Sequence, residues 1–265
     1  MKRFLSLGAG VQSSTLALLI AKGEVEPIDC AIFADTQWEP RAVYEWLDWL
    51  ETMVPFPVHR VTRGSLRKAI EDKQNATGQR FASIPWFTLD ENGKQGMGRR
   101  QCTREFKLDP LVREKRRLLG LAFGQRAKGV LCETLIGIST DEASRMRDSS
   151  ERWNRNVYPL IDLRMSRADC LRWMERNGYP RPPKSSCIGC PFHSDRQWRE
   201  IQSNPDEWAD VLAVDELIRE PVSGVRAEQF MHASRRPMAE IDFSTAEERG
   251  QINLFENECE GMCGL

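Results

Sequence analysis

The sequence predicts an α/β fold: a parallel sheet flanked by helices, followed by a C-terminal helical subregion and a cysteine-bearing tail. Short apolar runs of strand length alternate with segments that carry apolar residues at helical spacing. A loop containing two glycines joins the first such run to the first helical segment. The chain has 265 residues, 40% of them hydrophobic, which is enough to bury a core.

The pattern predicts each element in turn. After the Pro-rich stretch at 180–183 the chain changes character, so we expect one domain at 1–180 and a second region at 181–265. The stretch at 74–98 is polar and irregular and is predicted to be a lid or specificity loop. The expected strands are 2–7, 28–34, 56–61, 133–138 and 157–161, and the expected helices are 13–22, 40–53, 63–73, 105–119, 195–202 and 205–219.

Composition excludes some classes of protein. There are 38 Lys and Arg against 39 Asp and Glu, so no overall field marks a nucleic-acid or membrane partner. The stretch at 99–117 is basic and the stretch at 240–265 is acidic. No run reaches the roughly 20 apolar residues of a membrane span. We expect a cytoplasmic protein whose eight cysteines serve metal binding or catalysis more readily than disulfides.

The loop at 6–15 is the first candidate binding site. It follows a strand and opens a helix, the place where backbone N–H groups and the helix dipole attract phosphate. It fits neither the Walker A pattern nor the dinucleotide spacing. The glycines allow close approach of the backbone, and the hydroxyls add donors. The candidate contacts are Ser6, Gly8, Gly10, Gln12, Ser13 and Ser14.

Polar residues also end the second predicted strand. Asp35 and Thr36 stand where a parallel sheet presents ligand-contacting residues. They are candidates for ribose, adenine or metal contacts. The alternative is that Asp35 merely caps the following helix.

Further motifs follow in a fixed order: Arg100-Gln-Cys-Thr103 with Lys107 and Pro110, then 137–145 (Gly-Ile-Ser-Thr-Asp-Glu-Ala-Ser-Arg), then 158–161 (Tyr-Pro-Leu-Ile), then Cys187-Ile-Gly-Cys190. With the loop and the strand end, this order resembles the PP-loop family. The similarity is to the branch of phosphoadenosine phosphosulfate reductases and of the sulfurtransferase subunits of DNA phosphorothioation systems. It covers most of residues 1–195 and implies a Rossmann-like (HUP) sheet.

The resemblance implies that the ligand is ATP or a related adenine nucleotide. Lys107, Arg145 and Arg147 would hold phosphates or a sulfonate, and Asp141 and Glu142 would organise that shell. Gly137 would lie at the nucleotide. The chain departs from the family in one respect, because its loop lacks the metal-assisting Asp of the usual Ser-Gly-Gly-x-Asp-Ser form.

The cysteines suggest a metal. The spacing of Cys187 and Cys190 lets two thiolates bind one ion. Basic neighbours favour a thiolate at Cys102, which is either reactive or a metal ligand. The resemblance implies that these three hold a [4Fe-4S] cluster and leave one iron open. Cys259 and Cys263 of the tail are the candidates for a fourth ligand. A zinc site that includes His193 is the alternative.

The leading functional hypothesis is a PP-loop sulfurtransferase that adenylates an acceptor and inserts sulfur. One alternative is a sulfonucleotide reductase that attacks its substrate with Cys259 or Cys263. Another is a noncatalytic nucleotide-binding subunit with structural zinc. Expected partners are an adenine nucleotide, a tRNA or DNA acceptor and a sulfur or electron donor protein, with a homodimer as one arrangement and no membrane.

Overall fold

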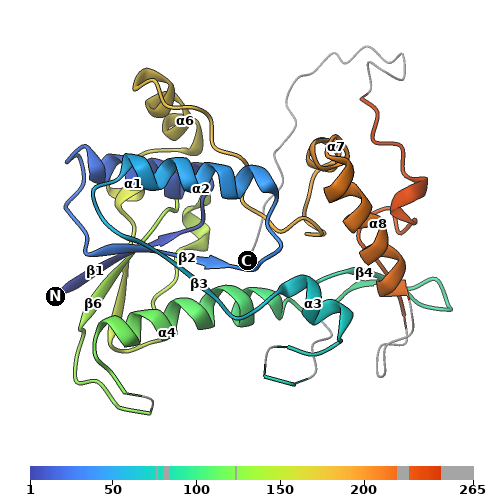
Figure 1. Cartoon of the computed structure of the whole chain (residues 1–265), viewed down its shortest axis with the longest axis horizontal. Coiled ribbons are helices and arrows are strands. Elements are labelled where there is room, and N and C mark those ends of the chain that lie inside the picture. The colour runs from blue at the N-terminus through green and yellow to red at the C-terminus, as the bar shows by residue number, and fades with distance from the viewer. Residues whose placement is uncertain (76, 80–83, 123, 220–226, 246–265) are drawn as a thin grey trace. The chain divides into compact units, whose positions relative to one another are not determined.

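The computed structural model describes residues 1–75, 77–79, 84–122, 124–219 and 227–245 (Figure 1). It divides into two compact units. Unit 1 comprises Met1–Gly64 and Arg104–Ser185, and unit 2 comprises Ser65–Thr103 and Ser186–Leu265. The stretch at 65–103, which we expected within the first domain, therefore groups with the C-terminal part of the chain.

Unit 1 contains a five-stranded parallel sheet in the order β3-β2-β1-β6-β7. This confirms the predicted fold class. Register is set between central strands, with Leu5 opposite Ala31 on one side and Leu135 on the other. The strands are β1 (Lys2–Leu7), β2 (Cys30–Asp35), β3 (Val58–Thr62), β6 (Cys132–Ile136) and β7 (Asn154–Val157).

Helices cover both faces of this sheet, as Figure 1 shows. One face carries α1 (Val11–Ala21), α2 (Arg41–Met53), the turn α5 (Pro159–Asp162) and α6 (Arg167–Arg176). The opposite face carries α4 (Asp109–Leu118), which a π-helical turn η1 (Thr103–Leu108) precedes. A 3-10 turn η2 (Thr140–Arg145) follows β6.

Alternation along the strands assigns side chains to the two faces. Leu5 and Leu7 point into a large apolar core against α1, α2 and α6. Phe4 and Ile32 point to a smaller cluster against α4. The side of the sheet that bears α4 thus has the less extensive apolar core.

One predicted strand is wrong. The sequence suggested a strand at 157–161, but β7 ends at Val157 and Pro159 opens the helical turn α5. Proline at the first helical position is pre-set for a helix and lacks the N–H that a strand would use.

Unit 2 combines a small antiparallel sheet with helices. The predicted irregular stretch contains two of its strands, and the third comes from much later in the chain, in the order β5-β4-β8. Both C-terminal helices have the predicted bounds. The elements are α3 (Leu66–Glu71), β4 (Phe87–Leu89), β5 (Gln95–Met97), α7 (Asp195–Gln202), α8 (Pro205–Arg219), β8 (Glu228–Phe230) and the 3-10 turn η3 (Met238–Glu240).

No helix among the described residues is long and apolar enough to span a membrane.

Candidate functional site at the carboxyl edge of the parallel sheet

The strand order of unit 1 creates a topological switch point. From β1 the chain moves outward through β2 to β3, and then returns to place β6 and β7 on the other side of β1. The segments that leave β1 and β6 therefore diverge. In open α/β sheets, ligands bind in the crevice beyond the carboxyl ends of the strands at such a point.

The β1–α1 loop places the start of a helix at this point. Gly10 is the N-cap of α1, and no side chain caps it, so backbone N–H groups of the first turn remain for a ligand. The Ser13 hydroxyl accepts a bond from the Gly8 N–H at 3.2 Å and donates to the Gly10 carbonyl at 3.3 Å. Ala9 adopts φ 57° and is fully buried. The loop is thus fixed by its own bonds.

The segment after β6 packs directly on this helix start. A Cβ at Gly137 would lie 2.7 Å from the backbone nitrogen of Ser13, closer than any side chain tolerates. Two residues on, the Ser139 hydroxyl accepts a bond from Gln12 Nε2 at 3.4 Å. Gln12 is in the part of the loop where the usual PP-loop form has Asp, and here it joins the two loops of the switch point.

The end of β2 presents a carboxylate. Asp35 Oδ1 accepts bonds from the Tyr44 hydroxyl at 2.8 Å and from the Gln37 N–H at 2.7 Å. Among the described residues, no hydrogen bond reaches Asp35 Oδ2. Burial and the bond to Asp35 raise the pKa of Tyr44, so this phenol stays protonated and keeps donating. Asp35 is therefore held in place with one oxygen open to a ligand.

Thr36 and Lys107 act together beside Asp35 through Glu39. The Thr36 hydroxyl donates to Glu39 Oε1 at 3.0 Å, and Lys107 Nζ lies 3.2 Å from the same oxygen. Thr36 is fully buried and Glu39 is 3% exposed. In this geometry Glu39 anchors Lys107. The sequence analysis did not single out Glu39.

Four further predicted residues follow β6. Burial raises the pKa of Asp141, but hydrogen bonds from Ser139 and from the Arg167 N–H lower it more, so the pKa is lowered overall. Arg145 pairs with Glu142 at 2.6 Å. The Arg147 guanidinium donates at 2.7 Å to the carbonyls of Ser144 and Met146.

Not every predicted contact faces the crevice. The Ser14 hydroxyl is fully buried and accepts a bond from Trp46 Nε1 at 2.9 Å. This hydrogen bond links α1 to α2. Phosphate contact by Ser14 stays a prediction. Ser6, Gly8, Gly10, Ser13, Asp35 and Gly137 all belong to the carboxyl edge of the sheet.

The predicted metal ligands lie in another part of the chain. Cys102, Cys187 and Cys190 all belong to unit 2 and are half-buried. The N–H of Cys190 donates to the Cys187 carbonyl at 3.0 Å, which closes the turn between them. Cys259 and Cys263 lie outside the described residues.

His193 supports the same turn. Its Nε2 lies 3.0 Å from the Cys187 carbonyl and 3.1 Å from the Ile188 carbonyl. Carbonyls only accept hydrogen bonds, so Nε2 carries the proton and is not disposed as a zinc ligand. Within the described ranges, no group of three or more His, Cys, Asp or Glu side chains is placed to hold a metal ion.

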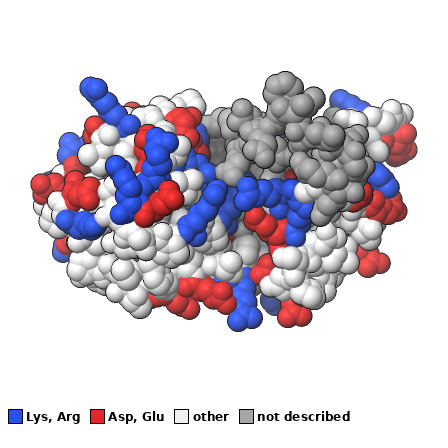
Figure 2. Space-filling model, turned by 90° about the horizontal axis from the view of Figure 1, so that it is seen from above, with Lys and Arg blue, Asp and Glu red and all other residues white. Residues whose placement is uncertain are grey.

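The basic stretch at 99–117 is partly used inside the protein. Arg117 pairs with Glu114 at 2.7 Å, and Glu114 also accepts from His59 at 2.6 Å. Lys115 is 7% exposed. Figure 2 shows Lys and Arg side chains beside Asp and Glu side chains on the visible face, in keeping with the net charge of −1.

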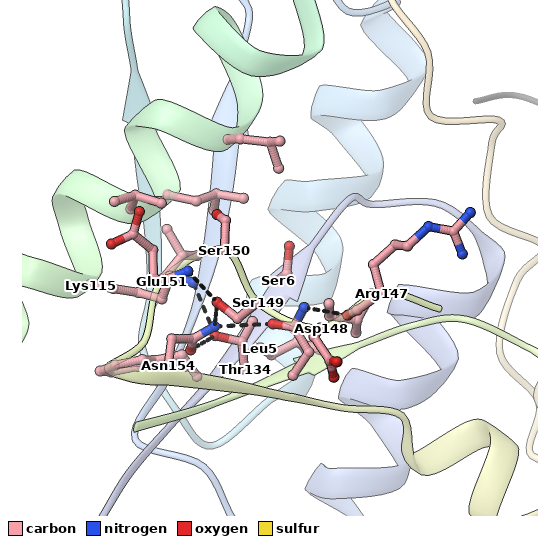
Figure 3. Close-up of a pocket in the computed structure, with 17 residues that line it drawn as sticks. Leu5, Ser6, Lys115, Thr134, Arg147, Asp148, Ser149, Ser150, Glu151 and Asn154 are labelled. Carbon is pink, nitrogen blue, oxygen red and sulfur yellow. Dashed lines mark hydrogen bonds between the residues drawn. The ribbon is translucent and has the colours of Figure 1, made fainter. Parts of the chain in front are cut away.

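A cavity of about 300 Å³ lies beside the switch point on the α4 face (Figure 3). Ser6 of β1 and Ile136 of β6 line it, together with Lys115 of α4. Sequence inspection missed Lys115 because it counted this residue with the exposed basic face. Its spacing from Leu111 and Leu118, four and three residues away, was the available signal that it faces inward.

No family model matches the chain, and no curated protein matches it. Among solved structures, the chain is similar to phosphoadenylyl-sulfate (PAPS) reductase from Candida auris in its phosphate complex. The TM-score is 0.45 at 13% sequence identity, over 69% of this chain and 75% of that chain. A likeness at this level does not identify a family.

Proposed function

We propose that unit 1 binds an adenine nucleotide at the carboxyl ends of β1 and β6, with its phosphates on the first turn of α1. The observation that carries this is the uncapped start of α1 at the switch point, with Gly137 packed against Ser13. Free backbone donors, the helix dipole and a close-packed glycine make a site for phosphate. Asp35 Oδ2 is positioned for a ribose hydroxyl or a metal ion.

We further propose that the reaction is sulfur transfer of the PP-loop type, supported by the order of motifs in the sequence. An acceptor oxygen attacks the α-phosphate of ATP, the bond to pyrophosphate breaks, and an adenylated acceptor forms. A sulfur nucleophile then attacks the activated carbon, and AMP leaves with the oxygen. In this scheme the N–H groups of α1 stabilise charge on the phosphates, and Lys107, held by Glu39, adds a cation.

The described residues alone do not form a site for the [4Fe-4S] cluster that the resemblance implies. Cys102, Cys187 and Cys190 do not make a group of three that could hold a metal, and Nε2 of His193 is used by backbone carbonyls. The proposed fourth ligand, Cys263, lies outside those residues. The cluster and zinc both stay predictions, and no step above depends on them.

The nucleotide site is tested with Asp35→Asn. The matched control is Asp48→Asn, at an exposed position of α2. Tyr44 and Gln37 both bond Oδ1, which Asn retains, so the fold should not change. We expect Asp35→Asn to weaken ATP and AMP binding about tenfold in calorimetry, the size of a lost bond to a charged group. Asp48→Asn should bind like the unchanged protein.

Product analysis then separates the reactions. ATP-dependent release of AMP and pyrophosphate with a nucleic-acid acceptor supports sulfur transfer. Release of sulfite from adenylyl sulfate with a thiol donor favours the sulfonucleotide reductase, which the Glu258-Cys259 tail motif suggests. Tight ATP binding without turnover would favour the noncatalytic subunit. Failure to bind any adenine nucleotide would overturn the proposal.

A further inference from the structure

The cavity of unit 1 is divided between an apolar and a polar side. Strands β1, β2 and β6 and helix α4 supply apolar groups, including Ile32, Leu111, Val112 and Ile136. Helix α4, β6, β7 and the loop at 147–151 supply polar ones. No helix follows β6 on this face, because the connection to β7 is the turn η2 and a loop. The space that such a helix would fill is left as the cavity.

A buried cation lies at the polar side. Lys115 is 7% exposed, and among the described residues it has no carboxylate within 4.0 Å. Its Nζ donates to Thr134 Oγ1 at 3.1 Å and lies 5.9 Å from the ring centroid of Trp153. A buried charge without a carboxylate in direct contact is costly, so the site favours a ligand that supplies one.

The hydrogen bonds around Lys115 have a fixed direction. An ammonium group can only donate, so Thr134 accepts from it and must give its own proton to Asn154 Oδ1, 2.6 Å away. The amide nitrogen of Asn154 then donates to Ser149 and Asn156, at 2.9 and 3.0 Å. Lys115 keeps two N–H donors for a ligand.

Ser149 adds another donor. Its Oγ accepts from the Asn154 amide and from the Glu151 N–H at 3.1 Å, so its hydroxyl proton is left to donate. Figure 3 shows Ser149, Thr134 and Asn154 joined by dashed bonds beside Lys115. The polar side of the cavity therefore has hydrogen-bond donors available for a ligand that carries acceptors.

The other charged groups at the cavity do not cancel this preference. Burial lowers the pKa of Lys115 more than Cys132 and the more distant Glu151 carboxylate raise it. Glu151 Oε2 accepts from Trp153 Nε1 at 2.8 Å, and Asp148 is exposed to solvent. The Arg147 guanidinium bonds backbone carbonyls and points away from the Lys115 cluster in Figure 3.

We infer that this cavity is a binding site for a small oxyanion carried on a flat apolar group, such as an aryl carboxylate. Its oxygens accept from Lys115 and Ser149, and its ring lies against Leu111, Val112 and Ile136. The volume of about 300 Å³ accommodates one such group. The cavity shares Ser6 and Arg147 with the predicted nucleotide contacts, so its test is done without nucleotide.

Three probes distinguish the chemistry in the full chain. We expect saturable binding of 4-fluorobenzoate, measured by ¹⁹F NMR. The neutral 4-fluorobenzamide should bind at least about tenfold more weakly. Inorganic sulfate, which lacks the apolar part, should compete only weakly. Equal affinity for the acid and the amide, or full competition by sulfate at equal concentration, would overturn the inference.

Lys115→Met should remove the preference for the acid over the amide, whereas exposed Lys128→Met should retain it.

A second readout needs no variant. Burial lowers the pKa of Lys115, and a bound anion should raise it again. The ¹³Cε signal of Lys115 should therefore titrate at higher pH with 4-fluorobenzoate but not with the amide. An unchanged titration would contradict the inference.

Discussion

The two faces of the parallel sheet in unit 1 are built differently. Against α1, α2 and α6, strand side chains such as Leu5 and Leu7 meet a continuous apolar core. Against α4, the same strands face a cavity in which Lys115, Thr134 and Asn154 form a polar chain. The first face supplies stability through packing. The second keeps polar groups buried, where each needs a hydrogen-bond partner.

The largest expected difference comes from truncation on the apolar face. Leu16 of α1 is fully buried in the core. Leu16→Ala should lower the free energy of unfolding by about 3 kcal/mol, through lost burial and the cavity left behind. Urea denaturation followed by circular dichroism measures it. Leu163→Ala, at a residue 45% exposed, is the control and should change stability by less than about 0.5 kcal/mol.

Cysteine reactivity should not distinguish the faces. Burial raises the pKa of Cys170 on the apolar face to about 12, and that of Cys132 on the α4 face to about 11. At two units above an ordinary thiol, thiolate is about a hundredfold scarcer. We expect alkylation at neutral pH, read by mass spectrometry, to spare both while half-buried Cys187 reacts. Labelling of Cys132 in the native protein would show that the α4 face opens.

Lys115→Met tests whether the cation on the α4 face contributes to folding. Replacing a buried charge by an apolar chain of similar length should leave the free energy of unfolding within about 1 kcal/mol of the original, or above it. A loss of about 3 kcal/mol, as for Leu16→Ala, would contradict the contrast between the faces.

The pH dependence of this variant sharpens the test. The folded pKa of Lys115 is lowered from 10.5, so the unfolded chain binds more protons in the window between the two values. Stability of the unchanged protein should therefore rise towards pH 10.5 relative to Lys115→Met. A constant difference between the two would mean that Lys115 is as solvated in the folded state as in the unfolded state.

The smallest effect is expected at Glu114, on the same helix. A bond from Arg117 lowers the pKa of Glu114 from 4.5 to about 2, with help from His59 and against desolvation. This stabilisation is present above pH 4.5 and is lost as the pH falls towards 2. The stability advantage over Glu114→Gln should shrink in that window, as acid titration of the unfolding midpoint would show. An advantage that persists at pH 2 would rule out the ionic origin.

Much of unit 1 could be predicted from the sequence. The apolar periodicity placed β1, β2 and α2 within a few residues, and it also placed both C-terminal helices of unit 2, since local pattern and burial agree there. The β1–α1 loop and Asp35 were found because glycines and polar residues interrupt apolar runs at strand ends. Lys107 was found only through the resemblance, and its anchor Glu39 was not.

Other features depend on contacts that no local pattern shows. The three-residue β4 pairs with β8, from Glu228 to Phe230, far along the chain. Strand β7 is polar and lacks an apolar run, so the sequence analysis predicted the strand in the more apolar residues that follow it, at 157–161. Lys115 reads as a surface cation in a basic stretch unless its spacing from Leu111 is given weight.

The central claim is that the switch point between β1 and β6 binds an adenine nucleotide. Hydrogen exchange of the full chain with and without ATP, followed by mass spectrometry, tests it most directly. The account predicts slower exchange in peptides covering 6–15, 35–39 and 137–145, where the loops after β1, β2 and β6 meet the ligand. Bound ATP that leaves these peptides unchanged and protects others would contradict it.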